Sequence, residues 1–164
     1  MKTLTLLPRW LFPLAAFRQC LAGLLMVFAS AAVTAATTDW QTIEPGGETV
    51  CAHGSPYRFF VREADPQKLL VFFQGGGACW SSQNCDLKNR PGFDPFATAD
   101  DNPATHAAGI FDISNEHNPL QDYSMIFVAY CSGDVHLGNV SRDYPIRDGA
   151  GGYDQSLHVE HRGY

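Results

Sequence analysis

Hydrophobic positions along this chain fall into a few short runs that are separated by long polar segments. The segment "YRFFVR", Tyr57 to Arg62, follows a turn signal at Gly54-Ser55-Pro56 and predicts a strand. Lys68 to Phe73 and Met125 to Tyr130 are nearly continuous apolar runs, a pattern typical of strands that are covered on both faces in a parallel sheet. About fifty residues rich in Pro, Asp, Asn and Gly separate these two runs.

Buried strands joined by long connections indicate an α/β fold with a mostly parallel sheet, because parallel neighbours require crossover connections. The pattern indicates just one short helix, around Ser81 to Lys88, so the predicted strands lack the helices that would cover both faces. The segment "DGAGGYD", Asp148 to Asp154, follows no apolar run and predicts a surface loop.

The first 35 residues have the pattern of a secretion signal. Lys2, Arg9 and Arg18 form a positive leader, Leu21 to Val33 is an apolar run, and small residues precede a cleavage position near Ala35. The run is shorter than the ~20 apolar residues that a membrane-spanning helix needs. We therefore expect residues 1–35 to be a signal peptide and residues 36–164 to form the exported chain, which is secreted or periplasmic and has no membrane association.

The exported part is strongly acidic. The leader holds three of the 11 basic residues and none of the 17 acidic ones, which leaves a net charge of −9. Nucleic acids and anionic membranes bind proteins through Lys and Arg, so we expect neither as a partner.

Four cysteines follow the leader: Cys51, Cys79, Cys85 and Cys131. An even number in an exported chain predicts two disulfides, for which three pairings exist. The close pair Cys79 and Cys85 is able to staple one short loop, which would leave Cys51 to pair with Cys131. A zinc site is the weaker interpretation, because no C-x2-C spacing occurs.

Three consecutive glycines, Gly75 to Gly77, follow the apolar run that ends at Phe73. Glycines at the carboxyl end of a buried strand let bare backbone N–H groups face a ligand. A phosphate-binding loop would need Gly-Lys-Ser/Thr, and a dinucleotide-binding loop would need G-x-G-x-x-G, and neither is present. The remaining interpretations are a purely structural turn and the oxyanion hole of an α/β-hydrolase, which fits better.

The strings "LLVFFQGGGACWSSQNC" and "GIFDISNEHNPLQDYSMIFVAYCSGDVHLGN" resemble the N-terminal half of the pectin acetylesterase family, over roughly Lys68 to Tyr164. The resemblance implies an α/β-hydrolase-like fold and a serine esterase activity without a cofactor or metal. It also implies that the amides of Gly76 and Gly77 form the oxyanion hole and that Cys79 pairs with Cys85. The region near Cys51 matches the family poorly, so the resemblance does not extend to the pairing of Cys51 with Cys131.

The chain departs from this family in one respect. Family members carry the nucleophile in a Gly-x-Ser-x-Gly elbow, followed by an Asp and a His, and no such elbow occurs before Tyr164. The resemblance thus implies a chain truncated before the nucleophile elbow, with all three catalytic residues after Tyr164.

The segment "CSGDVH" contains the three residue types of a triad, Ser132, Asp134 and His136. On an extended segment, residues i and i+2 lie about 6.6 Å apart, which is too far for the hydrogen bond between a nucleophile and its base unless Gly133 makes a tight turn. We therefore expect Ser132 and Asp134 to bond local backbone groups and to form the rim of a cleft.

Two further motifs have weaker interpretations. His158 and His161 in "HVEH" would face one way on a helix, but their spacing is not the i, i+4 of helical zinc ligands, so we expect no metal. Trp80 fits a residue packed against the Cys79–Cys85 loop better than a platform for substrate.

The sequence predicts the N-terminal part of a secreted serine carboxylesterase that removes an acyl group, above all acetyl, from a carbohydrate or another small ester. The expected part is itself inactive, because it lacks the nucleophile. The alternative is a non-catalytic exported module that binds a glycan or another partner through the same cleft.

Overall fold

The computed structural model of the protein describes residues 39–89 and 91–163. The predicted signal peptide and its cleavage near Ala35 lie outside the described residues.

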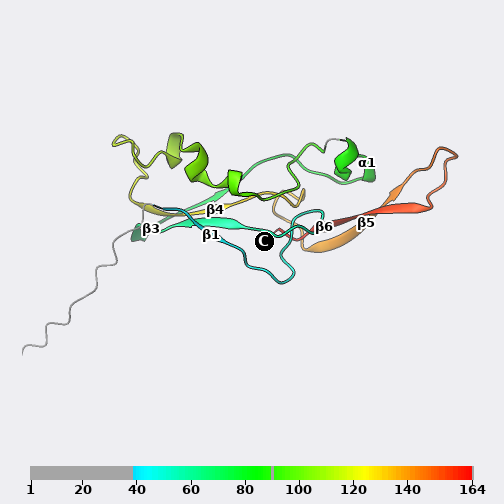
Figure 1. The fold of residues 1–164 in the computed structure, drawn as a ribbon, viewed down its shortest axis with the longest axis horizontal. Helices are drawn as coiled ribbons and strands as arrows, with labels where there is room; N and C mark the ends of the chain where they lie inside the picture. Colours follow the sequence, from blue (N-terminus) through cyan, green and yellow to red (C-terminus); the bar gives the residue numbers. More distant parts are fainter. Residues whose placement is uncertain (1–38, 90, 164) are drawn as a thin grey trace, which may run out of the picture. The chain divides into compact units, whose positions relative to one another are not determined.

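Four strands form one sheet in the order β1-β2-β4-β3. Figure 1 labels β1, β3 and β4 of this sheet. Their bounds are β1 Gln41–Ile43, β2 Phe59–Arg62, β3 Asp65–Phe73 and β4 Tyr123–Val128. The last three overlap the strands predicted from the sequence, although β4 ends two residues before the predicted end at Tyr130. The sheet is mixed, because β2 is antiparallel to both β1 and β4, and only β3 and β4 are parallel.

The expectation of a mostly parallel sheet is therefore not confirmed. An apolar run indicates how deeply a strand is buried, but it carries no information on the direction of its neighbours. The one parallel pair does have the long crossover that such a pair requires. Short helices make up this crossover: α1 Ser82–Cys85 and the 3-10 helices η1 Leu87–Asn89, η2 Ala99–Asp101, η3 Pro103–His106 and η4 Gly109–Phe111. The predicted helix at Ser81 to Lys88 is thus divided between α1 and η1.

Aromatic side chains form the core on one face of the sheet. Phe72 of β3 stacks on Phe127 of β4, and Phe60 of β2 meets Phe127 edge to face. Phe111 of η4 packs against both Phe72 and Phe127, with ring centroids 5.1 and 5.6 Å apart. The crossover therefore covers this face of the sheet.

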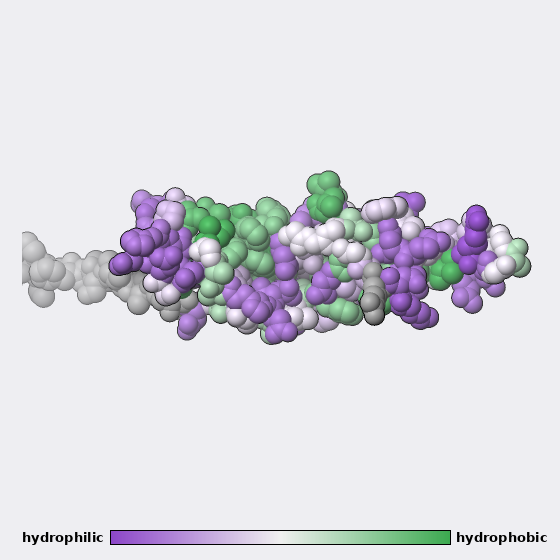
Figure 2. Space-filling view, turned by 90° about the horizontal axis from the view of Figure 1, so that it is seen from above, coloured by the Kyte–Doolittle hydropathy of each residue, from purple (hydrophilic) through white to green (hydrophobic). Residues whose placement is uncertain are grey.

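The opposite face of β3 is open among the described residues. Leu69, Val71 and Phe73 alternate along this edge strand and are 59%, 43% and 57% exposed. The apolar run is thus not covered on both faces in the described part of the chain, which agrees with the expectation that the predicted strands lack the helices to cover them. Hydrophobic patches among hydrophilic side chains are visible in the space-filling view (Figure 2).

A second sheet, absent from the expectations, is the hairpin of β5 Val140–Ile146 and β6 Gln155–His161. The predicted loop at Asp148 to Asp154 connects these two strands. In β5, only Tyr144 is buried, so the strand has no apolar run that would identify it.

The segment Val50 to Ala52 connects the two sheets. Ala52 donates its amide to the Cys131 carbonyl after β4 and accepts from the Glu160 amide of β6. Cys51 forms a disulfide with Cys131, and both cysteines are fully buried.

Candidate functional site

The glycine triplet forms an irregular loop directly after β3. Gly75, Gly76 and Gly77 are all exposed. Gly77 has φ of +84°, and a Cβ atom there would lie 2.1 Å from the carbonyl oxygen of Gly92. Only glycine fits this position, because any side chain would overlap the backbone of the facing segment.

The carbonyl groups at both ends of the triplet are fixed by side chains from the segment after β4. The carbonyl oxygen of Gln74 accepts a hydrogen bond from Nε2 of His136 at 2.9 Å. The carbonyl oxygen of Gly77 accepts one from the Tyr130 hydroxyl at 2.7 Å. Since a peptide unit is planar, each bond sets the orientation of one whole peptide group.

Between these two fixed groups lie the amides of Gly76 and Gly77. Neither donates a hydrogen bond to any residue in the described ranges 39–89 and 91–163. Exposed N–H groups on a constrained loop are suited to a ligand that carries negative charge.

Gln74 anchors the start of the loop through its side chain. Its Oε1 accepts from the Tyr130 amide at 2.9 Å, and its Nε2 donates to Asp101 at 3.0 Å. Gln74 also lines a pocket of about 530 Å³ together with Phe96, Asp100 and other residues of the crossover. A substrate group would therefore have room next to the start of the loop.

The Tyr130 hydroxyl is the centre of this arrangement. While it donates to Gly77, it accepts from the Val135 amide at 2.8 Å. Burial raises the pKa of the Tyr130 phenol, so the hydroxyl keeps its proton at neutral pH. Val135 and His136 have φ of +54° and +58°, values that cost energy for residues with a side chain and that the surrounding hydrogen bonds maintain.

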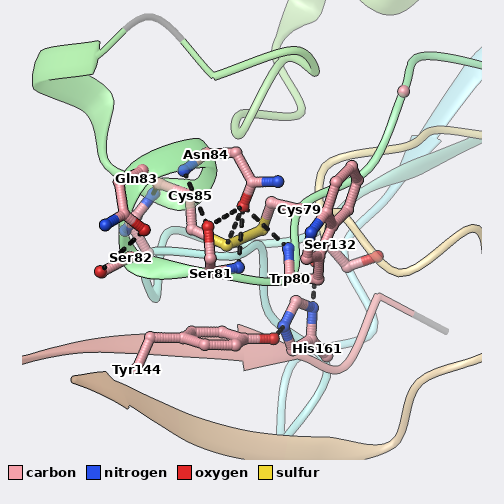
Figure 3. The surroundings of a disulfide bond; sticks show 12 residues. Cys79, Trp80, Ser81, Ser82, Gln83, Asn84, Cys85, Ser132, Tyr144 and His161 are labelled. Carbon is pink, nitrogen blue, oxygen red and sulfur yellow. Dashed lines mark hydrogen bonds between the residues drawn. A yellow bond between two sulfur atoms is a disulfide. The ribbon is translucent and has the colours of Figure 1, made fainter. Parts of the chain in front are cut away.

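The loop continues into the disulfide between Cys79 and Cys85 (Figure 3). Ser81 caps α1 by accepting from the Asn84 amide, and the Asn84 side chain accepts from the Ser81 amide. Both disulfides expected from the sequence are thus present. Trp80 is 71% exposed, so the expectation that it packs against the disulfide loop is wrong.

Cys79 donates its amide to the carbonyl oxygen of Gly133 at 2.9 Å. A Cβ atom on Gly133 would lie 2.9 Å from both the Cys79 sulfur and the Phe93 ring. The absence of a side chain at position 133 therefore lets the segment after β4 approach the disulfide.

Ser132 and Asp134 form a local polar cluster. The Ser132 hydroxyl donates to Oδ1 of Asp134 at 2.5 Å, and the amides of His136 and Gly138 donate to the same carboxylate. Asp134 lines a pocket of about 270 Å³, whereas the Ser132 side chain is buried.

The imidazole of His136 points to Gln74 and makes no bond to Ser132, so "CSGDVH" does not form a triad. Throughout the described ranges, no serine hydroxyl is hydrogen-bonded to a histidine ring.

The two histidines of "HVEH" lie on a strand, β6, and point to opposite faces. His161 is buried, and its Nδ1 donates to the Ser132 carbonyl oxygen while its Nε2 accepts from the Tyr144 hydroxyl (Figure 3). His158 is exposed and bonds Asp143 and Glu160. No group of three metal-binding side chains occurs among the residues that the structure describes, and none of their helices is long and apolar enough to cross a membrane.

Sequence reasoning missed the side chains that hold the glycine loop: Gln74, Tyr130 and His136. Gln74 directly precedes the glycines, and Tyr130 ends the apolar run that begins in β4. Both residues follow the carboxyl ends of the parallel strands β3 and β4, where side chains from neighbouring strands come together. This signal was available in the sequence. The role of His136 depends on the positive φ angles of Val135 and His136, which no sequence pattern indicates.

Comparison with known protein sequences relates the chain to one family. Residues 34–148 match the sequence model of the family described as Pectinacetylesterase. Palmitoleoyl-protein carboxylesterase notum1 of Xenopus laevis is 34% identical over 90 residues, which are 54% of this chain and 18% of that protein. Palmitoleoyl-protein carboxylesterase NOTUM of Homo sapiens is 32% identical over 98 residues, or 56% of this chain and 19% of that protein.

A shorter relative matches over the same extent of this chain. It is the inactive palmitoleoyl-protein carboxylesterase notum1b of Danio rerio, 29% identical over 94 residues, which are 56% of this chain and 68% of that protein. The chain therefore spans less than a fifth of the two carboxylesterases above and about two thirds of this inactive relative. Because the family model matches well over half of its length, the chain belongs to the pectinacetylesterase family.

Proposed function

We propose that the chain supplies the oxyanion hole of an exported carboxylesterase. The amides of Gly76 and Gly77 would bind the negative oxygen of the tetrahedral intermediate. The observation that carries the proposal is that these two exposed amides have no partner in the described ranges, while the peptide groups on either side are fixed by Tyr130 and His136. Donors held in place before the reaction stabilise developing charge without a reorganisation cost.

The reaction would follow the serine esterase route. A serine attacks the ester carbonyl, a histidine takes the serine proton and passes it to the leaving alcohol, and an aspartate orients the histidine. Residues 36–164 would form the N-terminal part of an α/β-hydrolase domain, with the three catalytic groups in sequence beyond Tyr164. In this scheme the 164-residue chain binds the acyl oxygen but does not hydrolyse the ester.

Ser132 and Asp134 would have a supporting role in this scheme. Their mutual hydrogen bond and the two amides bound by Asp134 stabilise the turn that carries His136. We assign them to the wall of the site and not to the chemistry.

The substrate would be an O-acyl ester, with a carbohydrate or another small alcohol on the leaving side. The relatives' names specify removal of a palmitoleoyl group from protein, and the family's name specifies an acetyl group on pectin. Export with cleavage near Ala35 is consistent with the two disulfides. The net charge of −9 argues against nucleic acid as a partner.

The test compares two proteins made from the same gene: the 164-residue chain and the product of the reading frame continued beyond Tyr164. We expect hydrolysis of p-nitrophenyl acetate by the longer product, inhibition by a serine-reactive phosphonate, and no turnover by the chain alone. A longer product that contains no Gly-x-Ser-x-Gly segment, or whose activity resists the phosphonate, would refute the serine mechanism.

A second candidate function is supported by the inactive relative from Danio rerio, of which this chain covers 68%. In this alternative, the chain is a non-catalytic exported module that binds a glycan or another partner through the same loop. A stop codon confirmed directly after Tyr164 would favour it over the esterase.

A further inference from the structure

One edge of the four-stranded sheet has no neighbour among the residues that the structure describes. β3 lies at the end of the strand order and pairs with β4, in unbroken register from Leu69 to Phe73. Gln74, directly after β3, donates its amide to the Val128 carbonyl oxygen of β4 at 3.0 Å. Because successive residues of a strand direct their backbone groups to alternate sides, the N–H and C=O groups of Leu69, Val71 and Phe73 point away from β4.

Features that ordinarily block an open edge are confined to the start of β3. Pro66 lacks an N–H group, and Lys68 forms ion pairs with Asp65 and Asp122 of its own chain. From Leu69 to Phe73 the sequence contains neither a charge nor a proline. This part of β3 is therefore an edge to which a further strand is able to bind.

The edge is complementary to itself. The five residues from Leu69 to Phe73 are all apolar. If two copies pair antiparallel with Val71 at the centre, Val71 faces the partner's Val71, and Leu69 faces the partner's Phe73. These are hydrogen-bonded pairs, because their N–H and C=O groups are the ones that point outward. Leu69, Val71 and Phe73 are 59%, 43% and 57% exposed, so their side chains are available for these cross-strand contacts.

Other registers make poorer pairs. A centre at Phe72 would place Leu69 opposite Gly75, which has no side chain. A centre at Leu70 would place Phe73 opposite the polar Gln67. The centre at Val71 is thus the register that matches apolar residues with apolar residues along the whole run.

Such a pairing would close after two copies. It leaves β1 at both ends of the joined sheet, and β1 is only three residues long, Gln41–Ile43. A very short edge strand is a poor template for further pairing. The arrangement has two-fold symmetry, with the same edge used by both copies.

We propose that β3 is the interface of a homodimer, in which two copies pair their β3 edges antiparallel around Val71 and form one continuous sheet. The partner is a second copy of this chain. The proposal is independent of the esterase function, because the interface lies within the described strand and its formation needs no substrate.

Sedimentation equilibrium of the 164-residue chain and of two matched double variants tests the proposal. Leu69→Lys with Phe73→Glu places opposite charges face to face in the proposed register, whereas Leu69→Lys with Phe73→Lys places like charges there. We expect a dimer for the original chain and for the first variant, and dimerisation at least about tenfold weaker for the second. Overall charge predicts the reverse order, because the second variant reduces the net negative charge that makes copies repel each other.

Cysteine cross-linking tests the register. Val71→Cys should form a disulfide between two copies, since opposite Cα atoms of a hydrogen-bonded antiparallel pair lie about 5.5 Å apart. Leu69→Cys is the control, because its counterpart in the partner lies four residues away along the strand, at about 14 Å. Gel electrophoresis without a reductant separates linked from unlinked chains.

Three results would overturn the proposal: a monomer at millimolar concentration, equal dimerisation of the two double variants, or equal cross-linking at the two cysteine positions. A monomer would leave the edge to a strand of another protein or of a further segment of this one. All substitutions are at exposed positions, and circular dichroism verifies that each variant folds. Because no turnover is measured, failure of the esterase mechanism and failure of the dimer are distinguishable.

Discussion

The Tyr130 hydroxyl lies 2.7 Å from the carbonyl oxygen of Gly77, although 53 residues separate the two in sequence. This contact joins the end of the apolar run of β4 to the loop after β3. The orientation of the Gly77 peptide group therefore depends on the hydrogen bond from the Tyr130 hydroxyl.

Tyr130→Phe should impair the oxyanion loop while leaving the fold intact. The substitution removes the hydroxyl that holds both Gly77 and Val135. In the continued gene product, we expect kcat to fall by about tenfold or more with KM little changed, a smaller loss than the ~10²–10³-fold cost of deleting an oxyanion donor. The control is Tyr57→Phe, which removes a hydroxyl bonded to the Ala129 carbonyl oxygen. An equal loss of kcat in the control would contradict a positioning role for Tyr130.

Asp134→Ala should destabilise the turn after β4. It leaves the Ser132 hydroxyl and the amides of His136 and Gly138 without their acceptor. We expect a loss of about 3 kcal/mol in the free energy of unfolding, measured by urea denaturation, and a smaller loss for Asp134→Asn. Asp86→Ala removes a carboxylate that accepts one exposed backbone hydrogen bond, and it should cost no more than about 0.5 kcal/mol. Similar values for Asp134→Ala and Asp86→Ala would refute the role of the cluster.

The two disulfides should contribute unequally to stability. The Cys51–Cys131 bond closes a separation of 80 residues and the Cys79–Cys85 bond one of only 6. By chain entropy, replacing the first pair with alanines should cost about 4 kcal/mol and replacing the second about 2 kcal/mol. Urea denaturation of the two double variants measures the difference, and the reverse order would show that local packing outweighs chain entropy here.

The β5–β6 hairpin should be more stable at mildly acidic than at alkaline pH. Hydrogen bonds that the His158 ring donates to Asp143 and then to Glu160 raise the pKa of His158 above its ordinary value of 6.5. Because the folded pKa is the higher one, the contribution is complete below 6.5 and is lost as pH rises through the folded pKa. The NMR titration of the His158 ring measures this pKa directly. Asp143→Asn should lower it, and an unchanged pKa in that variant would exclude Asp143 as the main cause.

The open face of β3 should promote association. Leu69, Val71 and Phe73 expose apolar side chains on an edge strand, which is a recognised aggregation hazard. Val71→Lys should reduce light scattering by the 164-residue chain at equal concentration. Val140→Lys, at an even more exposed position on β5, is the control. If both variants scatter like the original chain, β3 is not the associating edge.

Sequence reasoning identified what depends on local composition. The runs that became β2, β3 and β4 were recognised because each packs an aromatic side chain into one core. The pairing of the cysteines and the exposed glycine loop were also anticipated. The direction of the strands was not, because side-chain burial is the same for parallel and antiparallel neighbours.

The β5–β6 hairpin escaped prediction because most of its side chains are exposed, so neither strand has an apolar run. Among its inward positions, Tyr144 and His161 are polar, and their burial is compensated by a mutual hydrogen bond. Trp80 was misjudged for a related reason. A large apolar residue next to a disulfide is ordinarily buried against it. The residues around Trp80 in the sequence do not indicate where the β5–β6 hairpin lies, so they do not indicate that Trp80 is exposed.

The Cys51–Cys131 bond also bears on the order of events during synthesis. A chain that emerges with its N-terminus first presents Cys51, Cys79 and Cys85 before Cys131 exists. Among the cysteines of the described ranges, those available to Cys51 in that interval are Cys79 and Cys85. The native pairs form without rearrangement if Cys79 reacts with Cys85 before either of them reacts with Cys51. If Cys51 reacts with one of them first, a disulfide isomerase is needed to restore the native pairing.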